Sequence, residues 1–480
     1  MGTPVPRTWL AGAPRAGGAT TTHDLHDPNT GEVLQTYAFS SDAQVDDVLA
    51  AASAAHASGV WAEADPAERA AVLTAFATRL EGVADRIAEL DALNSGVPVR
   101  FTRMFARSLP DTVRRAVELA QEQAARRWLE ADGRSVQLRH VPWGPTALLL
   151  PWNAPAAVLV KSLAYALVAG APVVAKPSPE SPWSAEVVAG ALTSAGVPDG
   201  VFGLVHGGAH VGGLIAADPR VRAVSLTGST ATGRSVAATA GGNLTRLRLE
   251  LGSNNPAVVL ADADVPATAR ALVAGFTKLN GQWCEAPRAV FAESRLVEPL
   301  VEAVVAEIGR IAMGPSTSGD TTFGPLAFAG RKAALEDQIE RMVAGGARRL
   351  APLTTPPRGW FLSPTLLLGD DVRLPGEVFG PVLAISPVPD DRQAVAAANA
   401  LGGGLAGYVF TGDEERGMQV GARIVAGEVK LNGTSLLDMA RDSAQSFFGG
   451  SGLGGHGDRD VLEFYAGKQV LGADLLDPAI

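Results

Sequence analysis

Cys284 is the only cysteine among the 480 residues, and it lies in the segment Gly281-Gln282-Trp283-Cys284-Glu285-Ala286-Pro287. A single thiol cannot form an internal disulfide or a zinc site built from several cysteines. It is therefore either a buried side chain without chemistry or a reactive nucleophile. Glu250 lies 34 residues earlier, in the apolar run Leu249-Glu250-Leu251-Gly252. A thiol and a carboxylate that can act as a base are the groups that covalent acyl chemistry needs.

Asn153 is a candidate hydrogen-bond donor for that chemistry. It lies in Pro151-Trp152-Asn153-Ala154-Pro155, where a predicted strand ends and an apolar helix begins. A side-chain amide can donate two hydrogen bonds. Aimed at an alkoxide, such a donor stabilises the transition state of acyl transfer. The same position also suits an ordinary helix N-cap, so both interpretations stay open.

Two further segments are candidate binding sites for a phosphorylated cofactor. Gly228 and Ser229 lie in a strand, turn and helix pattern, where free N–H groups at the helix start can hold a pyrophosphate. The alternative is a plain capped turn. Lys176 follows an apolar strand, at the edge where parallel sheets bind ligands. Its ammonium could donate to ribose hydroxyls or to a 2′-phosphate, and the alternative is a solvated loop lysine.

The elements that must position these residues follow an alternating pattern. Ser41 and Gln44 form a predicted capping box, and Asp65-Pro66 predicts a second helix start. Asp132-Gly133 predicts a hairpin that could project as an arm. Short apolar strands alternate with helices of roughly 10–18 residues, which predicts a parallel sheet covered on both faces. The predicted strands are 146–150, 172–175, 201–205, 224–227 and 257–260, and a last helix and strand are predicted in 461–470.

The bulk composition excludes several classes of function. The net charge is −10 and the pI is about 5.3, which argues against a nucleic-acid partner. The most apolar stretch, 147–175, is interrupted by prolines, an asparagine and a lysine, so we expect no membrane span. We expect no metal site. With a free thiol and no export signal at the N-terminus, we expect a cytoplasmic protein.

Seven motifs in order identify the chain as similar to the aldehyde dehydrogenase superfamily. The resemblance covers nearly the whole chain, from about Asp27 to Val470. Each motif is unspecific alone, but the order and the spacing of Glu250 and Cys284 match that family. The motifs are Pro151–Pro155, Ala175–Pro182, Leu226–Gly233, Leu249–Gly252, Gly281–Pro287, Glu377–Val382 and Phe448–Gly450.

The resemblance implies roles for individual residues. Cys284 would be the nucleophile, Glu250 the base that activates water, and Asn153, with the backbone N–H of Cys284, the oxyanion hole. A thiohemiacetal and then a thioester would form on Cys284, and hydrolysis would release the carboxylic acid. The implied cofactor is NAD, with NADP possible. The implied cofactor-binding residues are Trp152, Lys176, Gly228, Ser229, Glu377 and Phe379.

The family's architecture implies an α/β protein with a Rossmann-like cofactor domain, an α/β catalytic domain and a small β oligomerisation arm. We place the dinucleotide-binding domain at 1–122 and 143–250, and the catalytic domain at 251–446. The arm and the C-terminal tail take 123–142 and 447–480. Members of this family form dimers or tetramers through such arms, so we expect a homodimer or a homotetramer acting on a small aldehyde.

The chain departs from the family's pattern at positions that bear on specificity. The usual glutamate slot after Lys176 holds Pro179, which leaves the choice between NAD and NADP open. The loop 432–447 is about five residues longer than the corresponding loop in the family. In the family this loop lines the aldehyde tunnel, so its length predicts an unusual substrate shape. Lys161 occupies a slot that is typically aromatic, so Lys161, with Arg103 or Arg107, could recognise an anionic aldehyde. Trp283 instead favours an aromatic or apolar substrate.

Two other functions compete with aldehyde oxidation to a free acid. One is an acylating enzyme that passes the thioester to coenzyme A, in which the water activation implied for Glu250 would be unwanted. The other is a non-catalytic homologue with a structural or binding role, against which the presence of Cys284, Glu250 and Asn153 argues.

Overall fold

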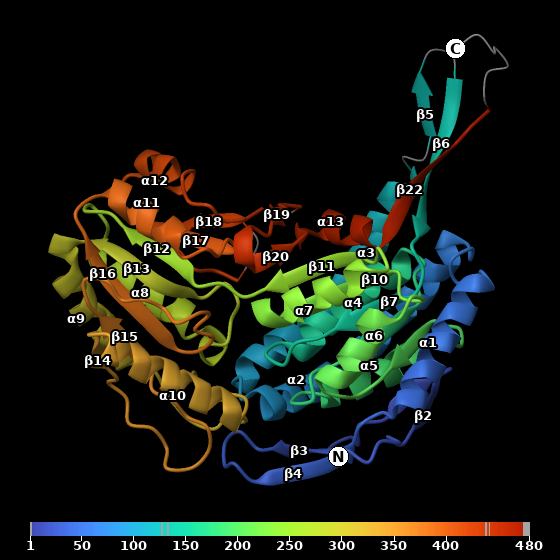
Figure 1. Ribbon diagram of the computed structural model, residues 1–480, viewed down its shortest axis with the longest axis horizontal. Coiled ribbons are helices and arrows are strands. Elements are labelled where there is room, and N and C mark those ends of the chain that lie inside the picture. The colour runs from blue at the N-terminus through green and yellow to red at the C-terminus, as the bar shows by residue number, and fades with distance from the viewer. Residues whose placement is uncertain (1, 126–127, 132–133, 437–438, 441, 474–480) are drawn as a thin grey trace.

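Two mixed α/β regions and a projecting β arm make up the computed structural model (Figure 1). It describes residues 2–125, 128–131, 134–436, 439–440 and 442–473. Within this part of the chain, no helix is long and apolar enough to cross a membrane.

The first region is built on an eight-stranded sheet within the described residues. Its five central strands are parallel, as predicted from the alternation of strands and helices. The order of these strands reverses between β7 and β10, and such a switch point opens a crevice at the carboxyl ends of the strands. In sheet order the strands are β2 (Ala13–Arg15), β1 (Thr8–Leu10), β9 (Phe202–Leu204), β8 (Val173–Lys176), β7 (Thr146–Leu149), β10 (Ala223–Gly228), β11 (Arg246–Leu251) and β20 (Gly452–Leu453).

Helices cover both faces of this sheet. One buried cluster joins the strands to α2 (Pro66–Ser95), α3 (Val99–Ala125), α4 (Pro155–Val168) and α5 (Trp183–Ser194). A second cluster, on the opposite face, contains residues of α1 (Asp42–Ala57), α6 (Ala209–Ala217) and α7 (Thr230–Gly241). A sheet buried on both faces needs nearly continuous apolar strands, which explains the runs seen in the sequence.

The predicted helix starts are confirmed. Ser41 caps α1, and Gln44 completes the capping box. Asp65 caps α2, Pro66 takes its first turn, and Gly96 ends it in the left-handed conformation (φ 73°). These local signals fix the ends of two helices that cover opposite faces of the first sheet.

The second region is a seven-stranded sheet within the described residues, parallel except at one edge. The change of sheet falls between β11, which ends at Leu251, and β12, which begins at Asn255. The division into domains at 250/251 stays a prediction, which this change supports. In sheet order the strands are β14 (Arg348–Leu350), β15 (Thr365–Leu368), β16 (Val382–Val388), β13 (Pro287–Glu293), β12 (Asn255–Val259), β17 (Ala406–Phe410) and β18 (Glu428–Leu431).

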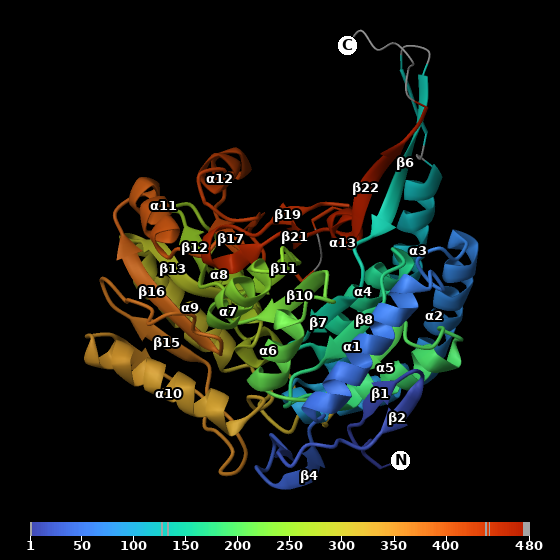
Figure 2. The same cartoon turned by 45° about the vertical axis from the view of Figure 1, so that its right-hand side comes forward.

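The helices of the second region surround its sheet in both views (Figures 1 and 2). The predicted strand 257–260 belongs to this sheet as β12 and not to the first. The helices are α8 (Val265–Phe276), α9 (Val297–Ile308), α10 (Ala329–Ala344), α11 (Asp391–Ala400) and α12 (Glu414–Gly421).

The arm is a three-stranded antiparallel sheet that projects from the body (Figure 2). It contains β5 (Trp128–Ala131), β6 (Arg134–Pro142) and β22 (Ala466–Leu471), and β22 follows α13 (Asp458–Phe464). The last helix and strand are therefore confirmed. The predicted turn Asp132-Gly133 lies outside the described residues, but the strands beside it pair as a hairpin would. A small pair, β3 (Thr22–His26) and β4 (Val33–Ala38), crosses the base of the molecule, and β19 (Gln445–Ser446) pairs with β21 (Gly455–His456).

Candidate active site

A cavity of about 310 Å³ opens at the switch point between β7 and β10. The two sheets and the loop before β13 all contribute to its wall. Residues 34 to 129 positions apart in the chain therefore meet in one space. Of the residues predicted from the sequence, Trp152, Asn153, Gly228, Ser229, Glu250, Trp283, Cys284, Glu377 and Phe379 line the cavity.

Cys284 and Glu250 are in direct contact. The Sγ atom of Cys284 donates to Oε1 of Glu250 at 3.4 Å. The other carboxylate oxygen accepts a hydrogen bond from Thr227 Oγ1 at 3.2 Å. Thr227 and Glu250 are partners in the parallel register of β10 and β11, so the sheet itself fixes the carboxylate opposite the thiol.

The protonation states of this pair follow from their surroundings. Burial and the carboxylates of Glu250 and Glu285 raise the pKa of Cys284 well above its ordinary value. Burial alone would raise the pKa of Glu250, but His456, Arg248 and the Cys284 thiol outweigh it and lower that pKa. The resting state is therefore a neutral thiol that faces an ionised carboxylate.

The loop that carries Cys284 is held in an unusual backbone conformation. Leu279 (φ 50°), Asn280 (φ 58°) and Gly281 (φ 77°) all lie in the left-handed region. A Cβ at Gly281 would lie 2.2 Å from the backbone nitrogen of Pro381, so only glycine fits there. Asn255 Nδ2 donates to the carbonyl of Cys284 at 2.8 Å and so fixes the end of the loop.

Asn153 does not act as the helix cap that one interpretation predicted. Ala154 is the N-cap of α4, and within the described residues it has no side-chain cap. Nδ2 of Asn153 instead donates to the carbonyl of Gln282 at 2.9 Å, two residues before Cys284. One N–H of the amide is thereby used for orientation, and the amide has a second N–H to offer.

Ser229 begins α7 as its N-cap and accepts from the backbone N–H of Thr232 at 3.2 Å. The start of this helix faces the cavity through Gly228 and Ser229. The first N–H groups of a helix have no partner within it, so they can donate to an anion.

Glu377 and Phe379 line the same cavity as the start of this helix. Asn254 clamps the backbone on both sides of Glu377, because Nδ2 donates to Gly376 O at 2.6 Å and Oδ1 accepts from Val378 N at 2.9 Å. A Cβ at Gly252 would lie 1.6 Å from Glu377 Oε1, so glycine is required for this approach. The ring of Phe379 meets Trp152 edge to face, with centroids 5.5 Å apart.

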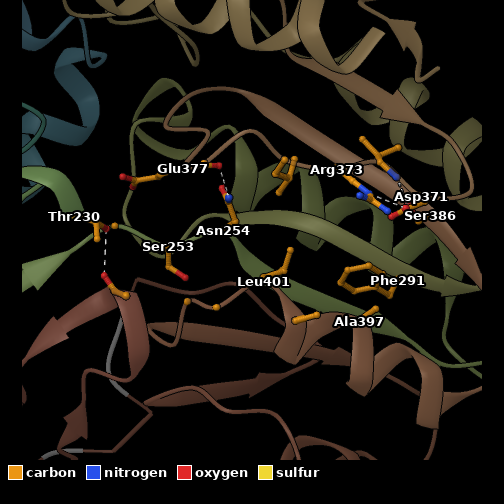
Figure 3. Close-up of a pocket in the computed structure, with 18 of the residues that line it drawn as sticks. Thr230, Ser253, Asn254, Phe291, Asp371, Arg373, Glu377, Ser386, Ala397 and Leu401 are labelled. Atoms are coloured by element: carbon orange, nitrogen blue, oxygen red, sulfur yellow. Dashed lines mark hydrogen bonds and ion pairs between the residues drawn. The ribbon is translucent and has the colours of Figure 1, made fainter. Parts of the chain in front are cut away.

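A second cavity of about 710 Å³ adjoins the first and shares Gly252 and Glu377 with it. Figure 3 shows Glu377 and Thr230 at one end of this cavity, Asn254 between, and Phe291 and Arg373 at the other end. Thr230, in the first turn of α7, also lines it. The two cavities therefore meet beside the start of α7.

Lys176 and Lys161 are not among the described residues that line the catalytic cavity. Lys176 is the last residue of β8, and its Nζ donates to Gly207 O at 2.8 Å and to Pro177 O at 3.1 Å. Burial lowers its pKa to about 8. Lys161 Nζ lies 3.2 Å from Asp458 Oδ1.

The other residues suggested for anion recognition also have acidic neighbours. Arg103 and Arg107 both lie 3.5 Å from Asp85. Glu180, one position beyond the glutamate slot of the resemblance, lies 3.3 Å from the imidazole of His23.

The sequence did not single out several residues that line the catalytic cavity. His456 lies 3.4 Å from Glu250. Arg331 on α10 also lines the cavity, and its charge acts on Glu377. Phe105 and Leu436 add apolar wall. The sequence feature that could have pointed to His456 is a histidine within the glycine-rich segment 449–457. The feature that could have pointed to Leu436 is the long loop 432–447.

Comparisons with known proteins agree on one family. The model of the aldehyde dehydrogenase family matches residues 16–470. The 4-(hydroxymethyl)benzenesulfonate dehydrogenase TsaD1 of Comamonas testosteroni is 33% identical over 445 residues, covering 92% of this chain and 91% of that protein. Geranial dehydrogenase of Castellaniella defragrans is 31% identical, covering 84% of this chain and 86% of that protein.

Solved structures agree in fold. The crystal structure of HpcC from Thermus thermophilus superposes with a TM-score of 0.93 at 30% identity, covering 99% of this chain and 94% of that one. Aldehyde dehydrogenase C from Pseudomonas syringae, crystallised with NAD+ and octanal, gives 0.90 at 28% identity and covers 98% of each chain.

Proposed function

Because the chain belongs to the aldehyde dehydrogenase family and is an oxidoreductase, we propose that Cys284 is its nucleophile and Glu250 its base. The reaction is oxidation of an aldehyde to a carboxylic acid. The observation that carries the assignment is the 3.4 Å contact between Sγ and the carboxylate inside the cavity. Within the printed sequence no second thiol could take this role.

The first step begins with the thiol proton. The raised pKa of Cys284 means that the thiolate must be generated by a neighbour, and Glu250 Oε1 is the acceptor in contact with it. The sulfur then bonds to the aldehyde carbon, and the carbonyl oxygen becomes an alkoxide. The free N–H of Asn153 donates to that oxygen, an interaction worth about 3 kcal/mol in comparable sites.

The residues around the cavity fit a nicotinamide dinucleotide. The start of α7, with Ser229, would hold the pyrophosphate. Glu377, held by Asn254 against Gly252, would accept from a ribose hydroxyl, and Phe379 with Trp152 would flank the ring. When bound, the cofactor supplies the acceptor for the hydride that leaves the aldehyde carbon.

We propose NAD as the cofactor and NADP as the alternative. Pro179 replaces a carboxylate that would compete with a 2′-phosphate, and Glu180 is engaged with His23. Lys176, close to the same loop, could serve either cofactor. The ratio of kcat/KM for NAD and NADP decides between them.

Hydrolysis then releases the acid. Once the proton taken from the thiol has passed to solvent, Glu250 removes a proton from water, the oxygen bonds to the acyl carbon, and the carbon–sulfur bond breaks to leave the thiolate of Cys284. A base in contact with the acylated sulfur favours water over coenzyme A as the acceptor. A coenzyme A thioester among the products would contradict this part of the proposal.

The cavity supports a neutral, apolar or aromatic aldehyde as substrate. The apolar side chains on its substrate side are Phe105, Val158, Leu279, Trp283 and Leu436. The carboxylate of Glu285 also lines the cavity and would repel an anionic aldehyde close to the nucleophile.

The competing proposal is an anionic aldehyde bound by Lys161. The name of the Comamonas relative includes a sulfonate, whereas the names of the other two relatives mention geranial and octanal. In this chain Asp458 neutralises Lys161, which favours the neutral substrate. Comparing octanal and benzaldehyde with 4-carboxybenzaldehyde separates the two proposals.

We propose that the arm forms a homodimer or homotetramer interface in a cytoplasmic protein. Trp128 (54% exposed) and Val470 (64% exposed) are large apolar side chains on the arm that a partner subunit would cover. Light scattering of the purified protein measures the assembly, and a monomer would contradict the proposal.

The activity is tested by the absorbance of the reduced nicotinamide across the aldehyde panel, with each cofactor. We expect turnover with neutral aldehydes and none in Cys284→Ala. Turnover in the variant equal to that of the unsubstituted protein would remove Cys284 from the mechanism.

A further inference from the structure

His456 lies on the catalytic cavity beside the proposed base. It ends the short strand β21, whose partner β19 places Gln445 opposite it. Nε2 of His456 is 3.4 Å from Glu250 Oε1. This is the same carboxylate oxygen that Cys284 Sγ contacts, also at 3.4 Å. The thiol of Cys284 and the imidazole of His456 therefore both contact the same oxygen of Glu250.

Arg248 holds the imidazole in this place. It lies two residues before Glu250 on β11, so both side chains project from the same face of the strand. Its Nε donates to the carbonyl of Gly455 at 3.1 Å, and its Nη2 lies 3.4 Å from Nδ1 of His456. The ring of Phe447 packs edge to face on the imidazole, with centroids 4.9 Å apart.

The backbone around His456 is equally constrained. β20 pairs antiparallel with β11, and Gly452 lies opposite Glu250. Gly452 has φ 124°, and a Cβ there would lie 1.8 Å from Leu249 O. Glycine at position 452 therefore allows β20 to pair closely with β11, the strand that carries Glu250.

The contact with Arg248 favours one tautomer of the imidazole. A guanidinium can only donate hydrogen bonds, so Nδ1 faces a donor and is the acceptor nitrogen of the ring. The proton of a neutral imidazole then lies on Nε2, the nitrogen that faces Glu250. In this tautomer His456 presents an N–H to the carboxylate.

We propose that His456 is a positioning residue that keeps the Glu250 carboxylate ionised and aimed at Cys284. The inference rests on the proposed function of Glu250. A buried carboxylate is costly unless donors surround it, and a donor to the ionised form stabilises that form. With His456 on Oε1 and Thr227 on Oε2, each oxygen has a partner while the carboxylate still reaches the thiol.

The other charged groups near the imidazole are already paired. Glu285 lines the same cavity and accepts from Gln445 Nε2 at 3.2 Å. Asp458, two residues after His456, lies 3.2 Å from Lys161 and 3.9 Å from Arg115. Arg248 and Glu250 are thus the charged side chains recorded in contact with the ring among the described residues.

The test compares two substitutions of one position. His456→Phe keeps a ring against Phe447 but removes the donor, whereas His456→Gln keeps a side-chain N–H. We expect kcat of His456→Phe to fall about tenfold or more, the effect of losing a hydrogen bond to a charged group, with KM for the aldehyde nearly unchanged. We expect His456→Gln to keep most of the activity.

The pH profile gives a readout that a purely structural role would not move. Without the donor the pKa of Glu250 rises, so the acid limb of kcat in His456→Phe shifts to higher pH. An acid limb at the same pH as in the unsubstituted protein, or an equal loss in the Gln and Phe variants, would overturn the proposal.

A third variant keeps the test decisive if His456→Phe does not fold. His456→Ala leaves a space beside Glu250, and added imidazole should restore activity there but not in Glu250→Gln. Absence of rescue in a folded His456→Ala with an unshifted acid limb would overturn the inference. If the unsubstituted protein oxidises no aldehyde, the proposed function itself fails; if it does and the His456 variants match it, only this inference fails.

Discussion

Two glutamates that line one cavity have opposite electrostatic surroundings. Glu250, on the first sheet, contacts an imidazole and a hydroxyl, and its pKa is lowered despite burial. Glu377 is attached to the second sheet region, and burial raises its pKa, with Arg288 and Arg331 offsetting part of the rise. The comparison teaches that burial alone does not set the pKa of a carboxylate; the charges and hydrogen-bond donors beside it also do.

The difference matches two tasks. A base must be ionised before it can take a proton from the thiol or from water, so Glu250 needs its donors in the resting protein. A residue that binds a cofactor hydroxyl needs only a carboxyl oxygen at a fixed place, which Asn254 and Gly252 provide for Glu377. Widely separated environments of this kind are a sign of distinct roles.

The largest expected effect comes from removing the base. Glu250→Gln should lower steady-state turnover about 10²–10⁴-fold, the range for a general base. Stopped-flow absorbance of reduced nicotinamide checks it.

The matched control for that substitution is Glu285→Gln, which removes a carboxylate from the same cavity without touching Sγ. It should keep turnover of neutral aldehydes within a few-fold. Equal losses in the two variants would show that charge in the cavity, and not the contact with Cys284, is what matters.

The next effect concerns the oxyanion. Asn153→Ala should lower kcat about 10²–10³-fold, because one donor to the alkoxide is lost. Asn153→Asp, of the same size but without the N–H donors, should lose as much. Steady-state kinetics at saturating cofactor measure both, and a change confined to KM would contradict the assignment.

Removing the other glutamate should have a smaller effect of a different kind. Glu377→Gln keeps a carbonyl oxygen at the same place, so we expect about a tenfold rise in KM for the cofactor with a smaller change in kcat. Initial rates at varied NAD concentration test this. A loss as large as that of Glu250→Gln would contradict the different roles proposed for the two glutamates.

A still smaller effect is expected from substituting Lys161. Lys161→Met should leave the ratio of kcat/KM for 4-carboxybenzaldehyde and benzaldehyde within about twofold, because Asp458 already neutralises this partly exposed lysine. A selective loss with the carboxylated aldehyde would instead support anion recognition by Lys161.

The smallest effect is on stability as a function of pH. The pKa of Glu250 is lower in the folded protein, so its contribution is present above the unfolded value of about 4.3 and is lost as pH falls through the folded value. For Glu377 the pKa is raised, so its protonation favours folding at low pH, and that contribution is lost as pH rises through the folded value. The melting temperatures of Glu250→Gln and Glu377→Gln, relative to the parent protein, should therefore change with pH in opposite directions.

The sequence predicted the parts of this site that depend on local patterns. Strand ends and helix caps are encoded within short segments, so the alternation of strands and helices could be predicted from them, whereas Trp152, Glu377 and Phe379 were implied only by the family resemblance. The family and the fold are confirmed, whereas the catalytic and cofactor roles of individual residues stay predictions.

What the sequence could not predict depends on long-range register. His456 meets Glu250 only because β20 returns antiparallel to β11. The pairing of Lys161 with Asp458 joins residues almost 300 positions apart in the chain. Neither contact follows from helix or strand periodicity, which reports on neighbours within a few turns.

The central claim is that Cys284 becomes acylated and that Glu250 governs its release. Mass spectrometry of Glu250→Gln, quenched after incubation with octanal and NAD, tests it most directly. Without Glu250 the thiolate forms only slowly, but release of the acyl group is blocked as well, so after long incubation the account predicts an added octanoyl group on the peptide that contains Cys284, dependent on the cofactor. The central claim would be contradicted if Cys284 stayed unmodified in Glu250→Gln and the Cys284→Ala variant still produced reduced nicotinamide.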